Sequence, residues 1–177
     1  MIHTVISLDE VVKEMKGVKI EKETEIQIDL KATSYIPDKY IDDSNLKIEI
    51  YQNIALCKNE EDIQNVTDEI IDRFGNIPKE VENLLQIARI KYLGKALKIE
   101  KIASTKTGVV FTFETKSEEG KLDIDIVKLV EKYGSRVKFS PGIKQRITLD
   151  VKDAKEKELL KEVIDFLKGV SNADNNK

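Results

Sequence analysis

The chain has 177 residues, of which 36% are charged, 40% apolar and 6% aromatic, and its formal net charge is −3. That length suffices for one large domain or two small ones with a buried core, and the apolar fraction is too high for a disordered chain. The negative charge argues against broad nucleic-acid binding, and no apolar run approaches the roughly 20 residues of a membrane span. The single cysteine, Cys57, has no partner for an internal disulfide, so we expect a cytoplasmic protein without membrane contacts.

The N-terminal part predicts a helix followed by a strand. Ser7 and Glu10 form a capping box ahead of an apolar stripe, and Gly17 would end that helix. Glu25–Ala32 then alternates apolar and polar side chains. This alternation predicts a half-buried strand.

Three helices are expected next, after a connector that Pro37 holds extended. We expect Ser44 to cap the first helix and Asn59 the second, and the third to begin near Pro78. The third helix either continues past Gly94 at some cost or breaks there. The apolar positions of the three helices predict these inward side chains: Leu46, Ile50, Tyr51, Ile54, Ile63, Val66, Ile70, Phe74, Val81, Leu84, Leu85, Ala88 and Tyr92.

The second half predicts two hairpins and two helices. The hairpin turns fall at Lys106–Gly108 and Pro141–Gly142. A helix between the hairpins would end at Gly134, and a last helix would start with a capping box at Asp153 and Glu156. The apolar residues that define these two helices are Leu122, Ile126, Leu129, Val130 and Tyr133 in the first and Leu159, Leu160, Val163, Ile164 and Leu167 in the last. Without regular βαβ alternation, the pattern predicts an α+β fold, in which a helical first part packs with a small mixed or antiparallel sheet that carries additional helices.

The stretch DEIIDRFGNIPKEVENLLQIARI, residues 68–90, is the most informative in the chain. Gly75 stands where a helix would end in the left-handed conformation. Glu69 and Asp72 lie in the last turns of that helix, where the dipole disfavours each anion by about 0.3–1 kcal/mol. Two interpretations are open. The acids form a solvated face relieved by Arg73, or they meet cations on a partner.

Other signals for chemistry are weak. Gly94–Lys95 and Gly120–Lys121 lack the remainder of a phosphate-binding loop, and the chain has too few Cys and His residues for a zinc site. His3 and Cys57 have no catalytic neighbours in the sequence, and Asp123 and Asp125 lack the other elements of a calcium loop. We therefore expect no catalytic residue, metal or cofactor in this chain.

Two further sets of residues could form contacts. Basic residues could form either a nucleic-acid site or an ordinary solvated helix face, and they are Arg89, Lys91, Lys95, Lys98 and Lys101. Tyr35 and Tyr40 flank Pro37 and could anchor a partner or pack the connector.

Three ordered segments carry a resemblance to a known family: EIQIDLKATSYIPDKYI, IEIYQNIA and DEIIDRFGNIPKEVENLLQIARIKYLGKALKIEKI. Together they closely resemble the C-terminal domain of bacterial transcription-repair coupling factor (Mfd), over Glu25 to Ile102. The resemblance implies that residues 1–20 are the end of a preceding motor module or a lead-in, and that residues 21–170 are the regulatory domain. The polar composition of residues 171–177 predicts a disordered tail.

In that family the full-length protein is an ATP-dependent DNA translocase that removes stalled RNA polymerase and recruits UvrA in transcription-coupled DNA repair. The resemblance implies that ATP and Mg belong to the motor domain, which is absent here, and that this domain is not an enzyme. It would act as a clamp that packs on the UvrB-like N-terminal module and masks the UvrA-binding surface. Glu69 and Asp72 match the helix-end acids that contact basic residues of that module. The alternative is a nucleic-acid-binding appendage that uses Arg89, Lys91 and Lys95.

Overall fold

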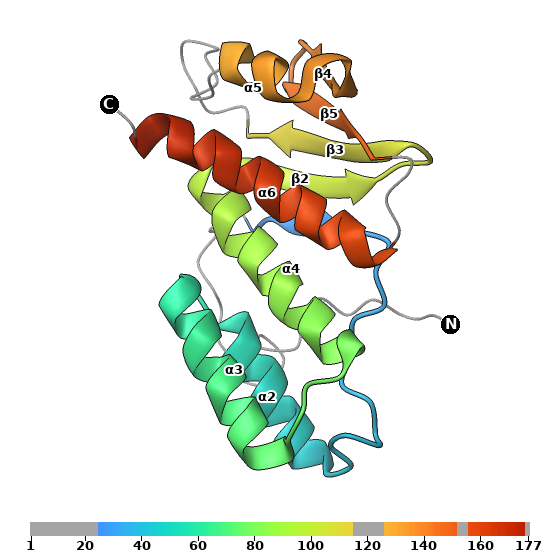
Figure 1. Ribbon diagram of the computed structural model, residues 1–177, viewed down its shortest axis with the longest axis vertical. Helices are drawn as coiled ribbons and strands as arrows, with labels where there is room; N and C mark the ends of the chain where they lie inside the picture. The colour runs from blue at the N-terminus through green and yellow to red at the C-terminus, as the bar shows by residue number, and fades with distance from the viewer. Residues whose placement is uncertain (1–24, 115–125, 152–155, 176–177) are drawn as a thin grey trace. The chain divides into compact units, whose positions relative to one another are not determined.

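The computed structural model describes residues 25–114, 126–151 and 156–175, which form an α+β structure (Figure 1). The elements in chain order are β1 (Gln27–Asp29), α2 (Ser44–Ala55), α3 (Glu60–Phe74), α4 (Lys79–Ala96), β2 (Ile99–Ser104), β3 (Gly108–Phe113), α5 (Ile126–Tyr133), the 3₁₀ turn η1 (Gly134–Arg136), β4 (Val137–Ser140), β5 (Arg146–Asp150) and α6 (Glu156–Asn175). The described residues fall into two compact units. Thr33–Arg89 forms the helical unit, and residues 25–32 with residues 90 onward form the sheet unit.

The helical unit consists of α2, α3 and most of α4 around an apolar core. The fully buried side chains include Ile50 and Ile54 of α2, Ile63 and Ile70 of α3, and Val81 of α4. Ile50 and Ile54 are four residues apart and Ile63 and Ile70 seven, which are spacings of one and two helical turns, so each helix turns one apolar face inward, as predicted. The predicted inward residues Leu46, Tyr51, Val66, Phe74 and Tyr92 are only half-buried.

The predicted start of α3 is confirmed, and that of α2 shifts by one residue. The Asn59 side chain accepts a hydrogen bond of 2.8 Å from the backbone N–H of Asp62. The cap of α2 is Asp43 rather than Ser44, because its carboxylate accepts hydrogen bonds from the N–H groups of Asn45 and Leu46 at 2.8 and 3.1 Å. A carboxylate is a strong acceptor at a helix N-terminus, where it also meets the positive end of the dipole.

Gly75 ends α3, but not in the left-handed helical conformation that we expected. Its φ of 86° is positive as predicted, while its ψ of −158° places it in an extended region. Only glycine adopts this region without strain, because any Cβ would crowd the neighbouring peptide groups. The Pro78 carbonyl then accepts the first helical hydrogen bonds of α4, from Val81 and Glu82 at 3.1 and 3.0 Å.

The helix α4 continues past Gly94 and ends at Ala96. A Cβ at position 94 would lie 2.5 Å from Cδ1 of Ile26 and 3.4 Å from Cδ1 of Ile102. The lost helix propensity at Gly94 is therefore accompanied by close packing of α4 on β1 and β2.

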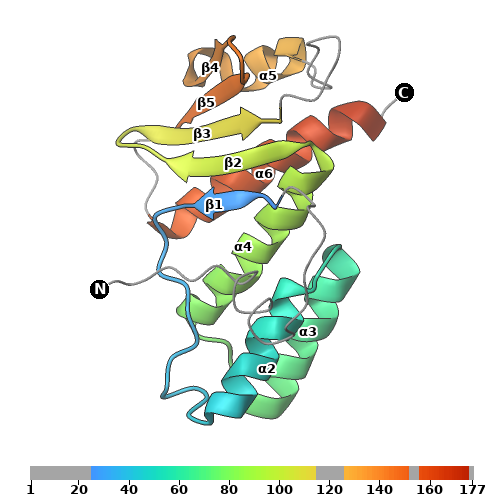
Figure 2. The same ribbon diagram turned by 180° about the vertical axis from the view of Figure 1, so that it is seen from behind.

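The sheet unit contains a five-stranded mixed sheet with the order β1-β2-β3-β5-β4. β1 pairs in parallel with β2 at one edge, and every other pair is antiparallel (Figure 2). Both predicted hairpins, β2–β3 and β4–β5, are present. Only Gln27–Asp29 of the predicted strand Glu25–Ala32 is paired, although the alternating burial extends over the whole segment.

One apolar row crosses all five strands of the sheet. The register places Ile28, Ile102, Phe111, Ile147 and Phe139 side by side in that order. The neighbouring positions along these strands are polar or less buried, so the sheet has one apolar face.

The helices α5 and α6 cover this apolar face. The ring of Phe166 on α6 stacks on Phe111 at 4.6 Å and meets Tyr133 of α5 at 5.4 Å. All the predicted inward residues of α6 are buried. In α5, Ile126 and Val130 follow the predicted helical spacing, but they are 38% and 51% exposed and are not part of the core. The eight-residue helix buries only Leu129 and Tyr133, which leaves its other apolar side chains outside.

Several predictions lie outside the described residues. They are the capping box at Ser7 and Glu10, the helix start at Leu122, and the residues His3, Asp123, Asp125 and Asp153. The helix α6 extends to Asn175, past the predicted start of the tail at Ser171.

Cys57 lies in the α2–α3 connection and is 8% exposed. Its thiol donates a hydrogen bond to the Asn53 carbonyl, with an Sγ–O distance of 3.4 Å. Burial, and to a smaller degree the charge of Asp62, raise the pKa of Cys57 to about 11. The residue is therefore a small buried side chain, as the sequence suggested, and its thiol is protonated at neutral pH.

We expect Gly108→Ala to destabilise the sheet unit, because a Cβ there would lie 2.1 Å from the Leu149 carbonyl oxygen on the neighbouring strand. Overpacking of this kind lowers the free energy of unfolding by about 1–3 kcal/mol. Gly142→Ala is the matched control, since its Cβ would meet only the Lys144 carbonyl at 3.7 Å. Denaturant unfolding followed by circular dichroism measures both variants, and equal stabilities would contradict the register of β3 and β5.

The raised pKa of Cys57 predicts slow alkylation of the folded chain. Iodoacetamide reacts with thiolates, so labelling at pH 8 should be much slower than in the chain unfolded by guanidinium, and should accelerate as the pH approaches 11. Mass spectrometry of timed samples measures the rates. Equal labelling rates of folded and unfolded chain at pH 8 would show that the thiol is neither buried nor shifted.

Candidate functional site

The acidic pair Glu69 and Asp72 lies on the last two turns of α3, and both side chains are exposed. The C-terminus of α3 is fixed by Gly75, whose N–H donates to the Ile71 carbonyl at 2.9 Å. The two acids are three positions apart in the sequence, so they project from neighbouring positions of one helix face. The structure thus presents both carboxylates to solvent at the carbonyl end of a helix, as the sequence predicted.

Glu69 takes part in contacts within the helical unit. Arg73 donates a hydrogen bond to it at 3.2 Å, and the Asn53 amide of α2 approaches it at 3.5 Å. The same Arg73 nitrogen also donates to Glu49 of α2 at 3.3 Å. The hydrogen bond to Glu49, together with the charges of both carboxylates, raises the pKa of Arg73. Arg73 therefore offsets the negative charge of Glu69, as the sequence suggested.

Asp72 differs from Glu69, because it has no hydrogen bond or ion pair within the described parts of the chain. Its charge lies at the negative end of the helix dipole, with no compensating contact from the residues that the structure describes. A cation from outside would relieve this unfavourable position more than it would at Glu69. Asp72 is thus the stronger candidate of the two for contacts with a partner.

A shallow groove of about 340 Å³ runs beside Glu69 between α2 and α3. Leu56 and Val66 contribute apolar surface to it, and Asn53 and Asp62 contribute polar groups. An arginine or lysine side chain combines an apolar stem with a charged head. The groove offers surface for the stem, and Glu69 lies at its side for the head.

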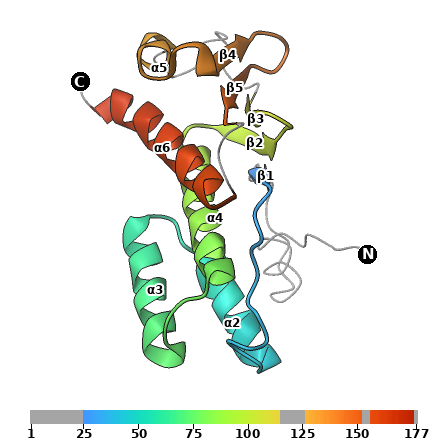
Figure 3. The same cartoon turned by 45° about the vertical axis from the view of Figure 1, so that its right-hand side comes forward.

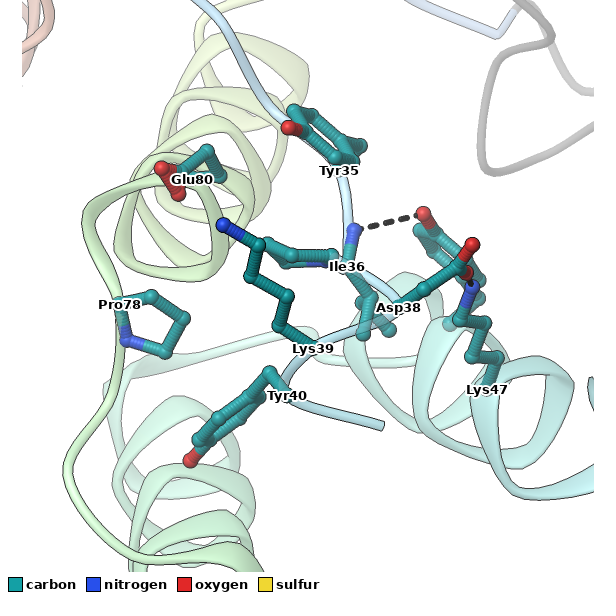
Figure 4. Close-up of a pocket in the computed structure, with 10 residues that line it drawn as sticks. Tyr35, Ile36, Asp38, Lys39, Tyr40, Lys47, Pro78 and Glu80 are labelled. Carbon is teal, nitrogen blue, oxygen red and sulfur yellow. Dashed lines mark hydrogen bonds and ion pairs between the residues drawn. The ribbon is translucent and has the colours of Figure 1, made fainter. Parts of the chain in front are cut away.

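A second groove of about 820 Å³ lies where the connector passes the start of α4 (Figure 4). Its walls are residues 35–40, Lys47, Tyr51, Pro78 and Glu80. The Tyr40 hydroxyl donates to the Gly75 carbonyl at 2.7 Å, and the ring lies 6.0 Å from that of Phe74. These contacts tie the connector to the end of α3, which the sequence did not reveal.

The two other tyrosines of this groove are arranged differently. The Tyr51 hydroxyl accepts a hydrogen bond of 2.8 Å from the Ile36 N–H, and burial raises the pKa of Tyr51. Tyr35 is 48% exposed at the groove, and Figure 4 shows Lys39 extending across the groove toward Glu80. Tyr40 and Tyr51 therefore pack the connector, and Tyr35 keeps surface for a contact.

The basic residues that were candidates for a nucleic-acid site do not form one continuous basic surface. Arg89 forms an ion pair of 2.8 Å with Glu60 and a hydrogen bond of 2.7 Å with Gln86, so its guanidinium is used within the helical unit. Lys91 is half-buried, Lys95 is exposed, and both make contacts of their own. Lys98 and Lys101 are exposed. This arrangement fits the ordinary helix-face interpretation better than a phosphate-binding surface.

Among the described residues, no group of three or more His, Cys, Asp or Glu side chains is arranged to hold a metal ion. None of the described helices has the length and apolar character required to cross a membrane.

The contacts to Arg73 from Glu49 and to Glu69 from Asn53 join residues far apart in the chain, so only the packing of α2 on α3 reveals them.

Comparison with known proteins places these features in a family. The chain is 36% identical to the transcription-repair-coupling factor of Bacillus subtilis (strain 168) over 168 residues, which is 92% of this chain and 14% of that protein. It is also 36% identical to the transcription-repair-coupling factor of Rickettsia prowazekii (strain Madrid E) over 140 residues, which is 79% of this chain and 12% of that protein. The chain thus spans about a seventh or less of the length of these relatives.

A solved structure agrees with these sequence similarities. The crystal structure of the C-terminal domain of transcription-repair coupling factor matches with a TM-score of 0.75 and 25% identity, over 88% of this chain and 98% of that one. The family model of the TRCF domain matches residues 30–123, just over half of the chain. This family-model match extends beyond Ile102, where the recognisable sequence motifs end. The chain therefore belongs to the TRCF domain family.

Proposed function

We propose that this chain is a non-catalytic regulatory domain of a transcription-repair coupling factor. In the resting full-length protein it binds the UvrB-like N-terminal module and masks the surface that recruits UvrA. Its connection to RNA polymerase and DNA is indirect, through the remainder of the polypeptide in the bacterial cytoplasm. Membership of the TRCF domain family and the exposed acidic pair support this proposal.

The observation that carries the proposal is the state of Asp72. An exposed carboxylate at the carbonyl end of a helix, with no compensating contact in the described residues, costs stability in the isolated domain. A basic side chain on a partner would remove that cost and add a charge-assisted hydrogen bond. The position is therefore better suited to a complex than to the domain alone.

Glu69 and the groove beside it extend this contact. Arg73 and Asn53 hold the Glu69 carboxylate at the groove, so little side-chain entropy is lost when a partner binds there. One basic residue would contact Asp72, and a second would place its stem in the groove and its head near Glu69. Hydrogen bonds to charged groups contribute about 1.5–3 kcal/mol each, and solvent and salt reduce this at an exposed site.

Such contacts suit a reversible clamp. Each 1.4 kcal/mol of interface energy changes the ratio of closed to open protein about tenfold. Two weakened contacts therefore favour the closed state without making release too slow. The alternative function, a nucleic-acid-binding appendage, loses its main bidentate donor, because Arg89 pairs with Glu60.

The double substitution Glu69→Ala/Asp72→Ala in the full-length protein tests the proposal. We expect UvrA to bind at least tenfold more tightly than to the unmodified protein, because the N-terminal module is released. Surface-immobilised UvrA and titrated full-length protein measure the affinity. Glu61→Ala/Glu82→Ala is the charge-matched control, since both residues are exposed acids of the helical unit and Glu61 lies about 16 Å from Asp72 along the axis of α3.

The isolated 177-residue domain provides the second control for this experiment. Asp72→Ala alone should leave it folded and raise its free energy of unfolding by about 0.3–1 kcal/mol, because a charge facing the dipole is removed. If the folded double variant and the control variant recruit UvrA equally in the full-length protein, the acidic pair is a solvated face and the proposed clamp contact is wrong.

A further inference from the structure

Exposed apolar side chains are concentrated in one short part of the sheet unit. Of the eight large apolar residues exposed in the described parts of the chain, five lie between residues 126 and 143. Val127 is 66% exposed and Val130 51% exposed, which is unusual for two β-branched residues on one short helix. We refer to Ile126, Val127, Val130 and Phe139 as the α5–β4 patch.

These four residues lie on two neighbouring elements of the sheet unit, α5 and β4. α5 turns Leu129 and Tyr133 inward, Ile126 and Val130 flank that buried side and are 38% and 51% exposed, and Val127 is 66% exposed. Phe139 ends the apolar row of the sheet on the edge strand β4, on the face that α5 and α6 cover. α5 contacts β4, and Figures 1 and 3 show the two elements side by side.

The segment that carries the patch has a positive charge that the whole chain does not have, although Glu162 and Asp165 of α6 lie near Tyr133. Residues 126–146 contain six Lys and Arg residues and one acid, a net charge of +5 in a chain of net charge −3. Arg136 pairs with Glu162 at 3.2 Å, and Lys144 pairs with Glu100. The basic side chains around the patch include Lys128, Lys132 and Lys138, of which the amino group of Lys132 lies over the ring of Tyr133.

We infer that the α5–β4 patch binds an acidic amphipathic helix of a partner protein. Its apolar stripe would cover Val127, Val130 and Phe139, and its acidic side chains would meet the surrounding lysines. Apolar contact provides most of the affinity in such a complex, and the charge pairs select the partner and its orientation. The inference is independent of the proposed function, since it uses neither Glu69 nor Asp72.

Three observations favour a helix of a protein over other ligands. Exposed Val and Ile side chains gain nothing from nucleic-acid phosphates, and this patch lacks the exposed aromatic series on which bases stack. A membrane surface is usually bound by a longer amphipathic helix than the eight residues of α5. An added strand is disfavoured because β4 has four residues, carries Lys138 and is followed by Pro141.

A fluorescence anisotropy titration of the 177-residue chain tests the inference. The probe is a labelled 18-residue designed helix with a Leu/Ile stripe and Glu on its polar face, and its twin carries Lys in place of Glu. We expect the Glu peptide to bind at least tenfold more tightly than the Lys peptide. Val127→Ser/Val130→Ser should weaken binding of the Glu peptide at least tenfold, and Ile71→Ser, a control at a residue 47% exposed in the helical unit, should have no effect.

Each remaining outcome would overturn the inference. The Glu peptide could fail to bind, bind no better than the Lys peptide, or bind the double variant as tightly as the unmodified chain. Labelled 20-nucleotide DNA and vesicles with anionic lipid form the other arms of the experiment. If the double substitution reduces binding of either one and not of the Glu peptide, the patch serves a different class of ligand. Circular dichroism confirms that each variant is folded.

Discussion

The backbone of Gly75 is the constraint on which the helical unit depends. Its φ of 86° and ψ of −158° end α3 at Phe74 and let α4 begin at Lys79. Other residues would hold this conformation only at a cost of about 1–3 kcal/mol. The Tyr40 hydroxyl bonds the Gly75 carbonyl, so the connector is attached at the same point. The carboxylates on the last turns of α3 therefore have a defined position relative to α2 and the connector.

Within this frame the two acids of the pair are not equivalent. Glu69 belongs to a small network with Arg73 and Asn53, and Asp72 has no comparable contact in the described residues. A network of this kind orients a carboxylate but also reduces its attraction for a further cation. In a complex, Asp72 would gain more binding energy from a cation of the partner, and Glu69 would fix the position of that partner. This division of roles follows from one arginine that bridges α2 and α3.

The sheet unit follows a different principle, since its stability rests on the apolar row that crosses five strands. Phe111 and Phe166 bury the centre of this row almost completely. The row is less covered by helices toward β4, where Phe139 is 38% exposed beside α5. The two units thus offer surfaces of different chemistry, one acidic and one apolar with a basic surround. Such a difference favours distinct partners, because like charges in the wrong pairing are costly.

The sequence by itself determined the class of fold, the helices α2 to α6, both hairpins and the buried faces of α2, α3 and α6, because these depend on local periodicity, caps and turn residues. It also placed Glu69 and Asp72 at the end of a helix. Only the tertiary structure decided that Glu69 contacts Asn53 and Arg73 contacts Glu49, that Arg89 pairs with Glu60, and that Val130 is 51% exposed. These outcomes depend on how far each helix is covered by others, and on contacts between residues distant in the chain. Periodicity identifies the apolar side of α5, but packing against α6 and β4 decides how much of it is buried.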